Sequence, residues 1–131
     1  MSSAAAIWAV VPAAGRGARM EAARPKQYLP LAGLPVLQHS LDCLLALPGL
    51  RQVVVALAPD DDHWRKLPAA SDPRVQTTIG GAERCDSVLA GLALLADFAA
   101  PEDWVLVHDA ARPCLALQDL KRLVDSLAED A

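Results

Sequence analysis

The stretch IWAVVPAAGRGARM, residues Ile7–Met20, decides the fold because a buried strand runs directly into a glycine-containing loop. Its first part, Ile7–Pro12, is apolar and rich in β-branched side chains, which is typical of a strand buried on both faces of a parallel sheet. Gly15 and Gly17 follow, and small residues let main-chain N–H groups turn toward an anion. The stretch therefore predicts a strand that ends at an anion-binding loop.

Similar apolar runs recur along the chain and alternate with helical patterns. Gln52–Ala58 and Trp104–His108 predict further strands buried on both faces, whereas the more polar Val75–Ile79 predicts a strand nearer an edge. Three apolar stripes have helical spacing: Leu37, Leu41, Leu44 and Leu45; Val88, Leu89, Leu92 and Leu95; and Leu120, Leu123, Val124 and Leu127. A short helical turn is expected within Asp61–Leu67. This alternation predicts a doubly wound α/β fold with a mainly parallel, Rossmann-like sheet, in which ligands bind at the carboxyl ends of the strands.

Composition narrows the possible partners. The chain has 131 residues, with 12 Lys and Arg against 16 Asp and Glu, and this length predicts a single domain over residues 1–131. A net charge of −4 argues against nucleic acid or an anionic membrane as the main partner. The apolar opening Ala4–Ala14 is too short for a membrane span. Three scattered cysteines, with no metal-binding spacing, indicate reduced thiols. We expect a soluble cytoplasmic protein.

Four cations follow the first loop: Arg16, Arg19, Arg24 and Lys26. Backbone donors combined with Arg and Lys suit a triphosphate, whose charge spreads over several oxygens. The alternative is a solvated charged surface, although these cations lack the i, i+4 spacing of a helix face. The loop has neither the Walker A spacing nor the third glycine of the dinucleotide fingerprint, which disfavours a dinucleotide-dependent oxidoreductase.

The loop after the strand at Trp104–His108 offers a second polar group. Asp109 could hold a ribose hydroxyl or help to place Mg²⁺, and it could equally be a helix cap or turn residue. His108 has no partner at ligand spacing and is interpreted as structural. Ser87 could read a base with its hydroxyl, or it could bond to its own helix backbone.

Four segments together resemble the 2-C-methyl-D-erythritol 4-phosphate cytidylyltransferase family of the non-mevalonate isoprenoid pathway. The segments are Ala13-Ala14-Gly15-x-Gly17-x-Arg19-Met20, Pro25-Lys26-Gln27-Tyr28-Leu29, Gly80-Gly81-Ala82-Glu83-Arg84-Cys85-Asp86-Ser87-Val88 and Val107-His108-Asp109-Ala110-Ala111-Arg112-Pro113. Ribitol-5-phosphate cytidylyltransferases share most of this pattern. Ala14 in place of a glycine and Tyr28 in place of Phe favour the isoprenoid family.

The resemblance implies a role for each matching residue. Arg19 and Lys26 match the catalytic pair that binds the triphosphate and stabilises the transition state. The residues matching the nucleotide site are Ala14, Gly15, Gly17, Gly81 and Ser87. Asp109 matches a carboxylate near the ribose, the metal and the second substrate, and Arg112 matches an arginine for the second substrate.

The same resemblance implies the reaction and its partners. The expected activity is transfer of CMP from CTP to 2-C-methyl-D-erythritol 4-phosphate with release of pyrophosphate, dependent on Mg²⁺. The full-length family is expected to form homodimers. Because its chains are longer, this sequence is expected to be an N-terminal portion that lacks the acceptor half. The alternatives are a ribitol-5-phosphate cytidylyltransferase and a CTP-binding fragment without turnover.

Overall fold

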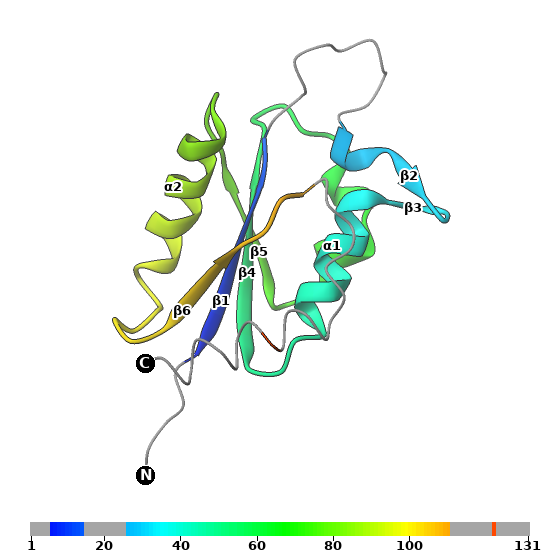
Figure 1. Cartoon of the computed structure of the whole chain (residues 1–131). Helices are drawn as coiled ribbons and strands as arrows, with labels where there is room; N and C mark the ends of the chain where they lie inside the picture. Colours follow the sequence, from blue (N-terminus) through cyan, green and yellow to red (C-terminus); the bar gives the residue numbers. More distant parts are fainter. Residues whose placement is uncertain (1–5, 15–25, 111–121, 123–131) are drawn as a thin grey trace.

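The computed structural model describes residues 6–14, 26–110 and 122, and its centre is a four-stranded parallel sheet (Figure 1). The strands are β1 (Ile7–Ala13), β4 (Leu50–Leu57), β5 (Val75–Ile79) and β6 (Trp104–Val107). Their spatial order is β5-β4-β1-β6, and every neighbouring pair is parallel. The predicted doubly wound α/β fold is confirmed. The sheet grows outward from β1 in one direction through β4 and β5 and in the other through β6, and ligands bind such sheets at this reversal.

In the described part of the chain, two helices cover the sheet, one on each face (Figure 1). They are α1 (Val36–Leu45) and α2 (Arg84–Leu95), and both match predicted stripes. The third predicted stripe, within residues 120–127, lies outside the described residues apart from position 122. The turn expected within Asp61–Leu67 is the 3-10 helix η2 (Trp64–Lys66), which η3 (Pro68–Ser71) follows. Over the described parts of the chain, no helix has the length and apolar character that crossing a membrane requires.

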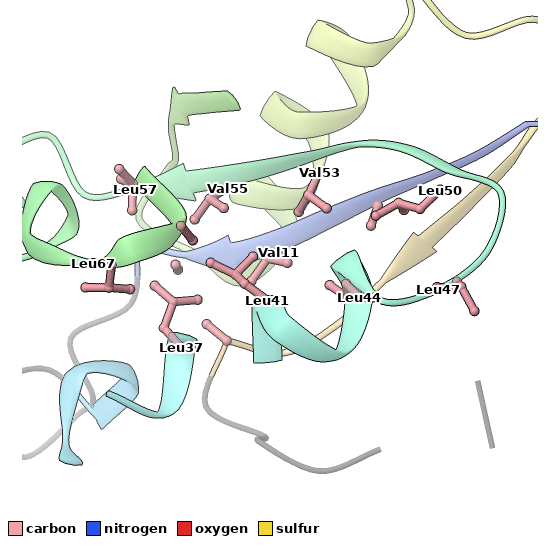
Figure 2. Close-up of a cluster of buried hydrophobic side chains, with 14 of the residues drawn as sticks. Val11, Leu37, Leu41, Leu44, Leu47, Leu50, Val53, Val55, Leu57 and Leu67 are labelled. Carbon is pink, nitrogen blue, oxygen red and sulfur yellow. The ribbon is translucent and has the colours of Figure 1, made fainter. Parts of the chain in front are cut away.

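The larger of the two hydrophobic clusters fills the space between the sheet and α1 (Figure 2). Val11, Val53 and Val55 are fully buried and point to the same face because alternate strand residues do so. Leu41 and Leu44 of α1 pack against them and are equally buried. Each such side chain stabilises the fold by roughly 1.5–3 kcal/mol relative to exposure, so this face holds the sheet in place.

The second cluster lies on the opposite face, between the sheet and α2. Trp8, Val10 and Val54 come from the sheet, and Leu95 comes from the helix. Gly91 brings α2 very close to β1, since a Cβ atom at this position would lie 2.5 Å from Cγ1 of Val10. The helix therefore packs on the strand through its backbone rather than through a large side chain.

The prediction that Leu89 belongs to the buried stripe of α2 is wrong, because this side chain is 63% exposed. The buried residues of the helix are instead Ser87, Gly91 and Leu95, at i, i+4 and i+8. Small residues form the contact face because the helix lies so close to the sheet, and the larger Leu89 points away from it.

The two edge strands of the described sheet, β5 and β6, differ in how well they agree with the prediction. β5 is partly polar and lies at an edge, as predicted. The run Trp104–His108 was expected to be buried on both faces, and this is wrong for β6, whose residues are half-buried or, at Val107, 43% exposed. The reason is its position: among the described strands, β6 pairs with β1 only.

One carboxylate joins the start of β1 to the start of β6. Asp103 Oδ1 accepts a hydrogen bond from the Ala6 N–H at 2.9 Å, and Oδ2 accepts from Trp8 Nε1 at 2.9 Å and from the Ala100 N–H at 2.8 Å. These bonds, that of the indole first, lower the pKa of Asp103 below its ordinary value. The two strands are thereby fixed in register at their amino ends.

A short antiparallel hairpin precedes α1 and was not predicted. It consists of β2 (Pro30–Leu31) and β3 (Leu34–Pro35). The turn residues Ala32 and Gly33 both have positive φ, 52° and 87°, as in hairpin turns of type I′. The hairpin leads directly into α1, which lies on one face of the sheet (Figure 1).

Candidate functional site

The loops after β1 and β5 meet at the carboxyl end of the sheet. The Gly80 N–H donates to the carbonyl of Leu57 at 2.8 Å, which continues the pairing of β5 with β4. A Cβ atom on Gly80 would lie 2.7 Å from Cβ of Ala14 and 2.5 Å from Oγ of Ser87. Only glycine fits this point, and its absence of a side chain brings Ala14 and Ser87 together. The meeting of these two predicted residues beside the reversal of the sheet follows from the topology.

The start of α2 holds Ser87 and Gly81 in one compact turn. Ser87 is 2% exposed, and its Oγ accepts a hydrogen bond from the Gly81 N–H at 3.2 Å. The Glu83 N–H donates to Oδ2 of Asp86 at 3.2 Å, as in a capping box. The capping interpretation of Ser87 is thus replaced by a bond to the preceding loop. A hydroxyl that accepts one bond retains a proton to donate, so Ser87 can still bind an acceptor atom of a ligand.

Asp109 follows β6 and is held by an ion pair with Arg84, the first residue of α2. Both Nε and Nη2 of Arg84 approach Oδ1 of Asp109, at 2.9 and 2.8 Å. The two side chains are 59% and 35% exposed, so solvent screens the pair and it contributes little to stability. Its main effect is geometric, because it fixes the carboxylate after β6 relative to the first residue of α2.

His108 is buried, which agrees with its structural interpretation. Its N–H donates to the carbonyl of Val10 at 3.0 Å, and its Nδ1 lies 2.9 Å from the carbonyl oxygen of Asp109. These contacts extend the pairing of β6 with β1 and orient the following residue. His108 therefore supports the position of Asp109.

The described residues offer a magnesium ion few protein ligands. Within residues 6–14 and 26–110, no group of three His, Cys, Asp or Glu side chains could hold a metal. Mg²⁺ is commonly bound by one or two carboxylates together with substrate phosphates and water, rather than by a cage of protein ligands. The oxygen donors of Asp109 suit such an ion only in the company of a phosphate.

The segment carrying Lys26 returns to the end of β1. It forms the 3-10 helix η1 (Lys26–Tyr28), and Nε2 of Gln27 donates to the carbonyl of Ala13 at 2.8 Å. This buried contact places the backbone of Lys26 beside the carboxyl end of the sheet, as a phosphate-binding role requires. No sequence pattern assigns this role to Gln27; the signal that could have found it is its place in the Pro25-Lys26-Gln27-Tyr28-Leu29 segment, next to Lys26.

Several predicted site residues lie outside the described part of the chain. These are Gly15, Gly17, Arg19 and Arg112, and with them Arg16 and Arg24. For Lys26 the structure describes the backbone alone. The described portion of the site therefore consists of a tight glycine turn, a buried hydroxyl and an oriented carboxylate.

The chain is similar to known cytidylyltransferases over nearly its whole length. A family model described as 2-C-methyl-D-erythritol 4-phosphate cytidylyltransferase matches residues 7–131. The chain belongs to this family. A relative of the same name from Pseudomonas putida (strain W619) is 62% identical over 126 residues, covering 95% of this chain and 54% of its own length. Another from Ectopseudomonas mendocina (strain ymp) is 60% identical over 125 residues, covering 95% of this chain and 53% of its own.

Solved structures of cytidylyltransferases share the fold. A crystal structure of 4-diphosphocytidyl-2C-methyl-D-erythritol synthase has a TM-score of 0.81 and 32% identity, covering 97% of this chain and 56% of that one. The 2-C-methyl-D-erythritol 4-phosphate cytidylyltransferase of Francisella tularensis has a TM-score of 0.76 and 29% identity, covering 95% and 52%. The chain thus spans about half the length of the relatives it matches.

Proposed function

We propose that this protein is a CTP-dependent cytidylyltransferase that transfers CMP from CTP to 2-C-methyl-D-erythritol 4-phosphate and releases pyrophosphate. One observation carries the proposal: the family match over residues 7–131 coincides with the meeting of Ala14, Gly80 and Ser87 at the reversal of a parallel sheet. This is the place where sheets of this kind bind nucleotides. The proposal treats the chain as one nucleotide-binding domain.

Cytidine recognition is assigned to the two glycine loops and the start of α2. The proposed contacts are with Ala14, Gly15, Gly17, Gly81 and Ser87. Cytosine differs from uracil by a 4-amino donor and an unprotonated N3. Main-chain groups and a hydroxyl donor can therefore distinguish the two bases, and the contact of Ser87 Oγ with the Gly81 N–H, which leaves the hydroxyl proton to donate, supports this assignment.

Triphosphate binding and transition-state stabilisation are assigned to Arg19 and Lys26. A phosphate oxygen of the acceptor attacks the α-phosphorus of CTP in line; the new P–O bond forms as the bond to pyrophosphate breaks. The acceptor phosphate is already a nucleophile, so the protein needs no covalent intermediate and acts by positioning reactants and neutralising charge. A guanidinium can bridge two phosphate oxygens, whereas an ammonium acts as a point charge.

Asp109 and Arg112 are assigned to the junction of ribose, metal and acceptor. Asp109, with the phosphates of CTP, would hold Mg²⁺, which neutralises charge on the phosphates when bound. The ion pair between Arg84 and Asp109 keeps this carboxylate at the carboxyl end of the sheet. Arg112 would bind the acceptor phosphate through its guanidinium.

The assembly and location are proposed by the same reasoning. We assign the full-length protein to a homodimer, as expected for its family, and to the cytoplasm, where CTP is available. A second candidate function is CTP binding without transfer; the chain spans about half the length of the relatives it matches. In that case CTP affinity persists while transfer falls near background.

Nucleotide choice is the first test of the proposal. With Mg²⁺ present, CTP should raise the melting temperature more than ATP, GTP or UTP at equal concentration. Binding to the folded state alone stabilises by roughly 2.7 kcal/mol at one hundred times Kd, so the difference is measurable by thermal unfolding. Equal stabilisation by ATP would show that the cytidine assignment is wrong.

Transfer itself is tested by pyrophosphate release, with 2-C-methyl-D-erythritol 4-phosphate and ribitol 5-phosphate as separate acceptors. Lys26→Ala should lower kcat far more than it raises KM for CTP, because the cation follows charge onto the leaving pyrophosphate; losing such a contact costs about 2.7–4 kcal/mol. Arg51→Ala removes a positive charge from an exposed side chain at the amino end of β4, away from the carboxyl end of the sheet, and is the control. A raised KM with unchanged kcat would limit Lys26 to ground-state binding.

A further inference from the structure

Side chains of the 3-10 helix η1 form hydrogen bonds with two other segments of the chain. On one side, Gln27 donates to the carbonyl of Ala13 at the end of β1. On the other side, the hydroxyl of Tyr28 donates to Oδ2 of Asp61 at 2.5 Å. Tyr28 is 1% exposed, so its ring and hydroxyl lie inside the protein although it is two residues from Lys26. Lys26 is therefore followed directly by two residues that make long-range contacts.

Asp61 is itself rigidly placed in the segment that follows β4. Its Oδ1 accepts hydrogen bonds from the N–H groups of His63 and Trp64, at 2.8 and 2.9 Å. Its own N–H donates to the carbonyl of Ala58 at 3.1 Å. The ring of His63 lies against that of Tyr28, with a centroid distance of 4.9 Å. One carboxylate therefore starts the turn at η2 and binds the phenol of η1 at the same time.

The hydrogen bond from Tyr28 to Asp61 adds to what burial of the aromatic ring alone would provide. A phenol is protonated at neutral pH, so the hydroxyl of Tyr28 donates to Asp61. Burial of the ring and the neighbouring Asp61 raise the pKa of Tyr28 further above its ordinary value. A hydrogen bond to a carboxylate is shorter and about twice as strong as one between neutral groups, and it is directional. The hydrogen bond therefore restricts rotation of η1 as well as its distance from the core. A buried phenyl ring without a hydroxyl would not restrict this rotation.

We infer that Tyr28 and Asp61 are positioning residues that hold Lys26 in place for cytidylyl transfer. The inference rests on the proposed function, because it gives Lys26 a role at the triphosphate. A cation placed before the reaction needs no reorganisation when charge develops. A displacement of about 1 Å in such a group can cost on the order of a hundredfold in rate, so a partial loosening of η1 should be measurable.

The test is a double-mutant cycle between Tyr28→Phe and Lys26→Ala, read as the rate of pyrophosphate release from CTP and the acceptor. Tyr28→Phe keeps the ring and removes the hydroxyl. It should lower kcat on the order of tenfold, as expected for weakening one charge-assisted contact, and leave KM for CTP within about twofold. In the Lys26→Ala background, the same change should have an effect of less than about twofold. Equal losses in both backgrounds would overturn the inference.

A second variant and a readout independent of activity complete the test. Asp61→Asn should accelerate amide exchange in residues 26–29 at least about tenfold while exchange in β1 stays unchanged. Asp72→Asn is the matched control, since Asp72 similarly accepts from a backbone N–H, that of Arg74 at 2.8 Å, far along the chain from η1. Unchanged exchange in both Asp61→Asn and Tyr28→Phe would overturn the inference. Absence of transfer in the unmodified protein would overturn the proposed function, while the exchange measurement would still report whether η1 is held.

Discussion

Gly91→Ala should destabilise the protein, although alanine is the better helix former. A Cβ atom at this position would lie 2.5 Å from Cγ1 of Val10, and Cγ2 and Cβ of Val10 would lie at 3.1 and 3.3 Å, so rotating that side chain brings no relief. To reach an ordinary contact of 3.4 Å, α2 must move away from β1 by about 0.9 Å. Overpacking of this kind costs about 1–3 kcal/mol, whereas the gain in helix propensity is about 1 kcal/mol. The free energy of unfolding should fall by about 1 kcal/mol.

Urea denaturation measures this change, provided that the m-value stays constant. Ala93→Gly, at an exposed position of the same helix, reports propensity alone and should cost about 1 kcal/mol. Introducing Gly91→Ala into a Val10→Ala background should be neutral or stabilising, because the overlapping methyl groups are gone. If Gly91→Ala instead raises the free energy of unfolding in the natural background, the account of close packing between α2 and β1 is refuted.

Three further predictions concern single polar contacts. Ser87→Ala should lower the free energy of unfolding by about 1 kcal/mol in urea titrations, since it removes the acceptor of the Gly81 N–H, and an unchanged midpoint would contradict that bond. Asp109→Asn should leave the stability of the nucleotide-free protein within about 0.5 kcal/mol, because the pair with Arg84 is exposed, yet reduce the rise in Tm caused by CTP and Mg²⁺. Asp103→Asn should lower Tm at neutral pH. Because the folded pKa of Asp103 lies below the unfolded value near 3.9, its stabilisation is complete above that value and is lost as pH falls through the folded pKa. Melting curves of the two proteins should converge below about pH 4, and a gap that stays constant down to pH 2 would exclude this linkage.

The main features of the fold could be predicted because they depend on local patterns. β1, β4 and β5 are short apolar or β-branched runs, and their bounds agree with the expected ones to within about two residues. The stripe of α2 was misassigned at Leu89 because hydrophobicity alone does not reveal that Gly91 forms the contact. The β2–β3 hairpin was missed because its strands have two residues each and contain prolines, which usually argue against strands.

Sheet topology and the family resemblance predict which loops form the site, but they do not predict the contacts that hold η1. Parallel strands bring their carboxyl ends to one edge, which is why Ala14 and Ser87 meet as expected. The bond between Tyr28 and Asp61 joins residues 33 positions apart, and no pattern in the sequence connects them. Contacts of this kind depend on how the segment after β4 packs, so they appear only in three dimensions.

Strand β1 pairs with β4 and β6, which both lie far along the chain, and this order matters during translation. Its neighbour β6 begins at Trp104, and the hydrogen bond between Ala6 and Asp103 spans 97 residues. At typical elongation rates of about 5–20 residues per second, roughly 5–20 s separate the appearance of these two segments at the ribosome. During this interval β1 can pair with β4 but leaves its other edge open, and open strand edges favour aggregation. The nascent chain should therefore need protection by chaperones most in the period between completion of β4 and completion of β6.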